Sequence, residues 1–105
     1  MNRGVELDVG AGGGEQQLSA ATVTSVMNRH INSFFSCVGP ELRRGGRLSK
    51  VQIDLAIAGS GQVLGVSVRQ GSSEFRKCVA AKVRRIRFPK FSAPRMATRF
   101  SFQVD

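Results

Sequence analysis

Two cysteines, Cys37 and Cys78, offer the widest choice of chemistry in this 105-residue chain. A cysteine pair with no cluster of other metal ligands around it can form a disulfide, remain as two buried thiols or act as a redox couple. The Cys-x-x-Cys spacing of redox couples is absent, because the two residues are far apart in sequence. A bridge between them would close a long loop and, on the chain-entropy treatment, stabilise the fold by about 4 kcal/mol.

The other potential nucleophiles and ligands have structural explanations. His30 is the single histidine and adjoins an apolar helical stripe, where it has no obvious second metal ligand or catalytic partner. The serines at expected cap and turn positions are Ser19, Ser60, Ser72 and Ser73. We therefore expect a protein that is not an enzyme, with no catalytic residues, metal or cofactor.

A glycine-rich segment near the N-terminus raises one enzymatic alternative. Residues 5–14 look like the first strand and loop of an S-adenosylmethionine-dependent methyltransferase. Such a site requires a parallel sheet and an acidic residue about 20 positions further on to hold the ribose. No acidic residue lies between Glu15 and Glu41, and the chain is too short for the remaining sheet. We interpret residues 1–17 as a flexible linker and residues 18–105 as one domain, and the methyltransferase fragment is the least favoured alternative.

The chain carries a formal net charge of +9, from 16 basic and 7 acidic residues. Such a charge attracts nucleic acid, anionic lipid or an acidic protein without selecting among them. The candidate basic surface comprises Arg76, Lys77, Arg84, Arg85, Arg87 and Lys90. Nucleic-acid binding by this surface is the alternative function. The chain has no tyrosine or tryptophan and its phenylalanines fall mainly on inward positions, which disfavours a base-stacking platform.

Hydrophobic spacing predicts a first helix with Ser19 as its N-cap. Its apolar stripe, with members four and three residues apart, consists of Val23, Met27, Ile31, Phe34 and Val38. Cys37 lies beside this stripe. Gly39-Pro40 is expected to end or sharply kink the helix, because proline disfavours helical geometry in the residue before it, and we expect the first helix to end near Val38. One more helical turn can follow over residues 41–44.

Alternating apolar and polar residues predict a β-hairpin after this helix. Its strands cover residues 51–58 and 64–68, and the turn lies at residues 59–62. Because side chains of a strand point to opposite faces in turn, one face is apolar and the other polar. The side chains expected to face the core are Val51, Ile53, Leu55, Ile57, Leu64, Val66 and Val68.

A second helix and a third strand complete the predicted elements. The helix is capped by Ser72 or Ser73 and stopped by Pro89. Its apolar stripe consists of Phe75, Cys78, Val79, Val83 and Ile86. The last strand, which follows Pro94, places one set of residues toward the core: Met96, Thr98, Phe100, Phe102 and Val104. Its other face carries Ala97, Arg99, Ser101 and Gln103.

The predicted order is α-β-β-α-β, an α+β fold. Because the second helix carries the chain back along the sheet, the third strand is expected antiparallel to the first and parallel to the second. A right-handed crossover then favours the strand order 2-1-3. Both helices would cover the same apolar face, which places Cys37 and Cys78 on neighbouring helices within bridging reach.

No run of about 18–20 apolar residues is present, and the N-terminus lacks the apolar segment of a signal peptide. We therefore expect any membrane anchor or export signal to lie outside this chain.

Several segments together resemble the TonB C-terminal domain, and in particular its myxobacterial relatives, the AgmX/PglI C-terminal domain. The resemblance covers roughly residues 18–105 and includes the helix that carries Cys37. The other matching segments are Gly46-Arg47-Leu48-Ser49-Lys50-Val51, Gly61-Gln62-Val63, Phe75-Arg76-Lys77-Cys78-Val79, Arg87-Phe88-Pro89 and Phe100-Ser101-Phe102. Their order and spacing carry the likeness.

The resemblance implies a non-catalytic, periplasmic, protein-binding domain at the C-terminal end of an inner-membrane-anchored protein. Such domains bind periplasmic or outer-membrane proteins in complexes that transduce energy or force across the cell envelope, in transport or, in some myxobacterial relatives, in gliding motility. The oxidising periplasm that it implies favours a Cys37–Cys78 disulfide over two thiols.

The third strand is the expected docking edge, because an edge strand has unpaired main-chain groups to which an extended peptide can add. Arg99 is expected to select acidic segments of the partner. The residues of this candidate edge are Met96, Ala97, Thr98, Arg99, Phe100, Ser101, Phe102, Gln103 and Val104.

Overall fold

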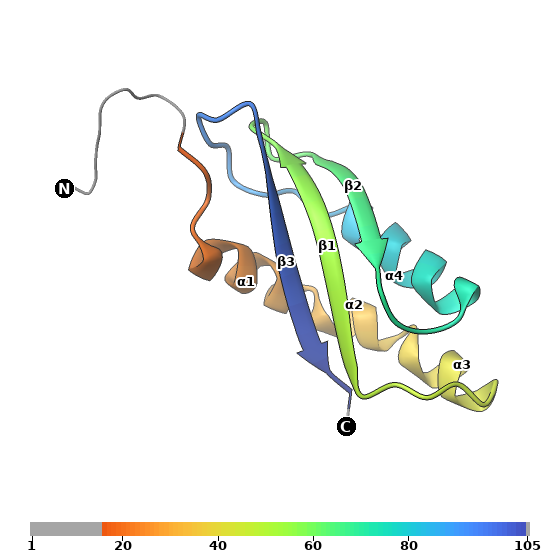
Figure 1. The fold of residues 1–105 in the computed structure, drawn as a ribbon. Coiled ribbons are helices and arrows are strands. Elements are labelled where there is room, and N and C mark those ends of the chain that lie inside the picture. The colour runs from red at the N-terminus through yellow and green to blue at the C-terminus, as the bar shows by residue number, and fades with distance from the viewer. Residues whose placement is uncertain (1–15, 105) are drawn as a thin grey trace.

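The computed structural model describes residues 16–104 of the chain, and the glycine-rich segment 5–14 lies outside them. Three strands form one antiparallel sheet: β1 (Lys50–Ala58), β2 (Val63–Val68) and β3 (Arg95–Gln103). Their spatial order is β2-β1-β3, and β1 is antiparallel to both neighbours. The helices all lie on one side of this sheet (Figure 1). The predicted α+β class, element order and strand order are confirmed.

The predicted first helix is divided into three short helices. They are α1 (Ala20–Arg29), α2 (Ile31–Phe35) and α3 (Val38–Arg43). The prediction that Gly39-Pro40 ends the helix near Val38 is therefore wrong, because Pro40 is the third residue of α3, which also includes most of the further turn expected over residues 41–44. In the first turn of a helix the main-chain N–H groups have no intrahelical acceptor, so a residue without an N–H is tolerated there.

Serine caps start the two longest helices. Ser19 Oγ accepts a hydrogen bond from the Thr22 N–H (3.1 Å) at the start of α1. Ser72 Oγ accepts one from the Phe75 N–H (3.2 Å) at the start of α4 (Ser73–Arg84). Both caps agree with the predicted helix starts. Within residues 16–104, no helix combines the length and the apolar character needed to cross a bilayer.

The core lies between the inner face of the sheet and the helices. The predicted inward residues of β1 are buried, as are most members of both helical stripes, whereas Cys78 is only partly buried. Phe34 of α2 stacks on Phe102 of β3 with ring centroids 5.9 Å apart, and it meets Phe100 edge-on at 6.4 Å. These rings bind the helical layer to β3.

Leu64 is the one predicted core residue of the hairpin that the structure places in solvent, with 53% of its surface exposed. The β1–β2 register shifts beside it, so that Ala56 faces Gly65 while Ile57 faces Val63. Leu64 is the extra residue of this bulge, and Val63 takes the inward position instead. A bulge moves the alternation by one residue, which is why a strict period of two predicts the wrong side for Leu64.

Gly61 and Gly65 provide a matched test of the hairpin. Gly61 has φ of +94°, and a Cβ there would collide with the carbonyl oxygen of Phe88. We expect Gly61→Ala to lower the free energy of unfolding by about 2 kcal/mol or more. Gly65 has open space around it, so Gly65→Ala should change stability by less than about 0.5 kcal/mol. Equal urea midpoints for the two variants would contradict the assigned turn.

Candidate functional site

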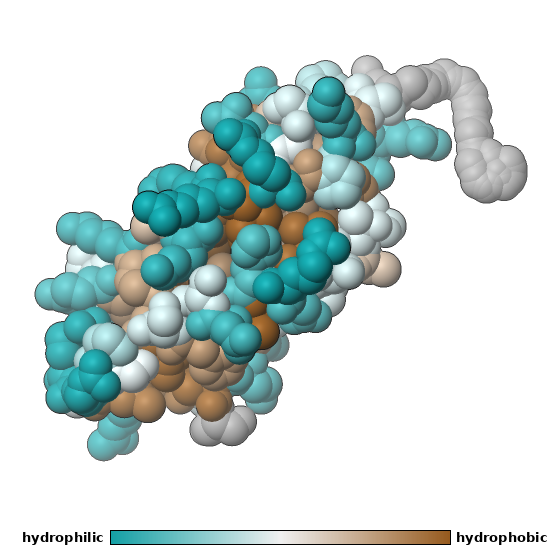
Figure 2. Space-filling view, turned by 180° about the vertical axis from the view of Figure 1, so that it is seen from behind, coloured by the Kyte–Doolittle hydropathy of each residue, from teal (hydrophilic) through white to brown (hydrophobic). Residues whose placement is uncertain are grey.

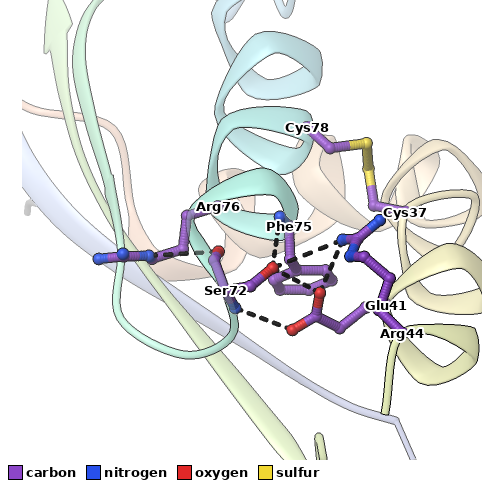
Figure 3. Close-up of polar contacts among 7 residues, drawn as sticks. All are labelled: Cys37, Glu41, Arg44, Ser72, Phe75, Arg76 and Cys78. Atoms are coloured by element: carbon purple, nitrogen blue, oxygen red, sulfur yellow. Dashed lines mark hydrogen bonds and ion pairs between the residues drawn. A yellow bond between two sulfur atoms is a disulfide. The ribbon is translucent and has the colours of Figure 1, made fainter. Parts of the chain in front are cut away.

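The two cysteines form a disulfide, as predicted. Cys37 precedes α3 and is buried, and Cys78 lies in the middle of α4. Their Cα atoms are 6.0 Å apart, and the bond closes a loop with a sequence separation of 41. It joins the first helical region to α4, so the two parts of the helical layer are covalently linked over the sheet (Figure 3).

Glu41 of α3 forms a second link between the same helices (Figure 3). Its side chain is buried, with 2% of the residue exposed. One carboxylate oxygen accepts hydrogen bonds from the Ser72 hydroxyl (2.6 Å) and from Arg44 Nη2 (2.7 Å). The other accepts the Ser72 N–H (2.8 Å). Because Ser72 is also the N-cap of α4, this carboxylate orients the cap and places negative charge at the positive end of the helix.

The hydrogen bonds from Ser72 hold the pKa of Glu41 below its ordinary value. The Ser72 hydroxyl is the largest cause, and the Ser72 N–H is the next; together with Arg44 they outweigh burial, which acts in the opposite direction. Sequence reasoning did not single out Glu41. The one nearby feature that could have indicated its role is Arg44, three residues further on. Ser72, whose hydroxyl and N–H both bind the carboxylate, is distant in sequence.

The free edge of β3 follows from its pairing with β1. The Val104 N–H donates to Ser49 O (2.7 Å) and the Gly59 N–H donates to Pro94 O (2.9 Å) at the two ends of this ladder. Hydrogen-bonded and non-bonded pairs alternate along an antiparallel ladder, so the inward-facing residues of β3 direct their main-chain groups to β1. The predicted edge residues with main-chain groups directed away from β1 are Ala97, Arg99, Ser101 and Gln103.

Arg99 is already engaged on the open face of the sheet. Its Nε donates to Asp54 Oδ1 (2.6 Å), and Arg69 Nε donates to Asp54 Oδ2 (2.7 Å). The hydrogen bonds from Arg99 and then Arg69 lower the pKa of Asp54, and Asp54 raises the pKa of Arg99. The charge of Arg99 is therefore shared with an intramolecular carboxylate, which reduces the attraction it offers to an acidic partner.

The candidate basic surface divides into two parts. All six of its residues are exposed, and Figure 2 shows hydrophilic side chains gathered over α4. Arg76, Lys77 and Arg84 line a groove of about 400 Å³ between α4 and β2. The other three, Arg85, Arg87 and Lys90, follow α4 and do not line this groove.

The remaining candidate ligands and nucleophiles are dispersed. His30 is the C-cap residue of α1, and Ser19 and Ser72 are N-caps. Within residues 16–104, no group of three or more histidine, cysteine, aspartate or glutamate side chains is placed to hold a metal ion. The features that the fold does bring together are strand edges with free main-chain groups and a cationic groove beside one of them.

The disulfide is expected to supply a large part of the stability. Cys37→Ser with Cys78→Ser should lower the free energy of unfolding by about 4 kcal/mol, the chain-entropy value for a loop of this length. Urea unfolding of the native protein with and without reductant measures the same difference. The unreduced protein should have the mass of the thiol form less two hydrogen atoms, and a thiol-form mass in native material would contradict the bond.

Glu41 is expected to make stability depend on pH in the acid range. Its pKa is lower in the folded state than in the unfolded chain, so its contribution is fully present above the unfolded pKa and is lost as pH falls through the folded pKa. Glu41→Gln should therefore destabilise the protein at neutral pH, and the gap between variant and native urea midpoints should narrow in acid. Carboxyls distant from residue 41 titrate alike in both proteins and cancel from the gap, whereas Glu74, whose pKa the charge of Glu41 raises, adds a smaller difference. A gap that does not change with pH would contradict this role.

Comparison of the chain with protein-family models, with curated proteins and with solved structures found no match.

Proposed function

We propose that this domain binds proteins without catalysing a reaction, and that it docks extended segments of cell-envelope proteins in the periplasm. The observation that carries the proposal is the free edge of β3, which runs for nine residues in unbroken register with β1. Main-chain groups along such an edge accept a further strand with little dependence on the partner's sequence.

The disulfide supports the compartment. Disulfides persist in oxidising compartments such as the periplasm and are rare in the cytosol. A small domain with one shallow core gains much from such a bond, which also holds the helices in place while the sheet edges remain accessible.

The likeness to the TonB C-terminal domain supports the wider assignment. The observed α-β-β-α-β order, the strand order β2-β1-β3 and the Cys37–Cys78 bond agree with what that resemblance implies. On this likeness, the chain would form the C-terminal end of an inner-membrane-anchored protein. Its complex transmits energy or force across the envelope, in transport or, as in AgmX/PglI relatives, in gliding motility.

Substitution at Ala97 tests the β3 edge. The Ala97 N–H points away from β1, so Ala97→Pro removes a donor from the free edge without removing a β1–β3 hydrogen bond. Ala97→Ser keeps the N–H and is the matched control. A photo-crosslinking residue at Gln103, in the native host, reports the bound partner.

We expect crosslinking to an envelope protein that Ala97→Ser preserves and Ala97→Pro reduces about tenfold, the equivalent of one or two main-chain hydrogen bonds. The same crosslinker at Ala81, an exposed position on α4, should give a different pattern. Undiminished crosslinking in Ala97→Pro would reject edge docking at β3, and a protein found only in the cytosol would reject the envelope function as a whole.

A further inference from the structure

The strand β2 has a second free edge with its own set of main-chain groups. The Arg69 N–H donates to Gln52 O (3.0 Å) at one end of the β1–β2 ladder. Alternation along this ladder directs the main-chain groups of Ser67 and Gly65 to β1, and those of Val66 and Val68 away from it. Within residues 16–104, β2 has β1 as its one strand neighbour, so the groups of Val66 and Val68 face an edge open to another strand.

A cationic wall runs beside this edge. The groove of about 400 Å³ is bounded by Val66, Ser67 and Val68 on β2 and by Arg76, Lys77 and Arg84 on α4. No carboxylate lines it. A ligand in the groove therefore meets strand donors and acceptors on one side and positive charge on the other. On β3, by contrast, Arg99 in the middle of the strand is bonded to Asp54.

The spacing of the wall differs from that of an extended chain. Lys77 and Arg84 are seven residues apart on α4, which is roughly 10 Å along a helix. Side chains on one face of a strand repeat every 6.6–6.8 Å or so. Carboxylates at every second position of an added strand do not repeat at this helical distance, and the long, flexible side chains of Lys77 and Arg84 would have to span the difference of a few ångström.

We propose that the groove between β2 and α4 binds an acidic, extended protein segment, which adds to β2 as a fourth strand and directs alternate carboxylates to α4. The inference rests on the proposed protein-binding function and names a partner class for part of the basic surface. It concerns a different edge from β3, so the two sites fail or succeed separately.

A synthetic peptide of ten residues, in which glutamate alternates with threonine and both ends are blocked, is the probe. Titrated into the isotopically labelled whole chain, it should shift the amide signals of Val66 and Val68 and of the α4 residues at the groove, and leave Ala97, Arg99 and Ser101 unchanged. A peptide with lysine in place of glutamate should not bind. A peptide with N-methyl groups at alternate residues keeps its charge but loses strand donors, and it should not bind either.

Two double variants distinguish an effect of the groove residues from an effect of the protein's net charge. Lys77→Ser with Arg84→Ser should weaken binding roughly tenfold, as expected for the loss of two exposed ion pairs. Arg29→Ser with Arg47→Ser removes the same charge from exposed positions elsewhere and should have less than a twofold effect. Val66→Pro removes a donor from the β2 edge and should abolish binding. If Val66→Pro fails to fold, the N-methylated peptide still tests whether binding requires main-chain hydrogen bonds, because it lacks the donors on the ligand.

Four outcomes would overturn the inference. Equal binding of the N-methylated peptide would show attraction by charge alone. Shifts confined to β3, or no shift at all, would reject the β2 site while leaving docking at β3 to its own crosslinking test. Tighter binding of a ten-nucleotide oligothymidylate to the same groove residues would assign the groove to nucleic acid rather than to protein.

Discussion

The junction between α3 and α4 is the constraint on which the remaining structure depends. A covalent bond joins Cys37 to Cys78, and the buried Glu41 carboxylate binds the cap of α4 through Ser72. The two links act at neighbouring points of one interface, so they fix both the separation of the helices and the start of α4. A charge with so little solvent contact is tolerated because each carboxylate oxygen accepts at least one hydrogen bond.

Because the helices all cover one face, the sheet keeps an open face and two edges (Figure 1). In an ordinary monomer such edges are a liability that favours aggregation. Here β2 is short and bulged at Leu64, and β3 carries exposed arginines, both of which hinder pairing between identical chains. Like-charged copies repel one another, so the net positive charge acts against self-association, and the same charge would attract the acidic segment proposed above.

The distribution of carboxylates decides which cations are available to a partner. In residues 16–104 the acidic residues are Glu41, Asp54 and Glu74. Glu41 binds Arg44, and Asp54 binds both Arg69 and Arg99. Most of the basic residues outside these ion pairs lie on α4, which packs beside β2, and in the segment after α4.

The sequence by itself determined the helix caps, the apolar stripes, the alternation of β1 and β3 and the strand order, because these depend on local periodicity and short connections. Only the tertiary structure decided the side of Leu64, the helical state of Pro40, the burial of Glu41 and the engagement of Arg99. Leu64, Glu41 and Arg99 each depend on a partner distant in the chain: the register against β1, Ser72 and Asp54. Pro40 is helical because it lies in the first turn of α3, and where that helix starts was not evident from the apolar spacing. The hydrophobic periodicity of a sequence indicates which face of a helix or strand a side chain occupies, but it does not indicate which distant group that side chain contacts.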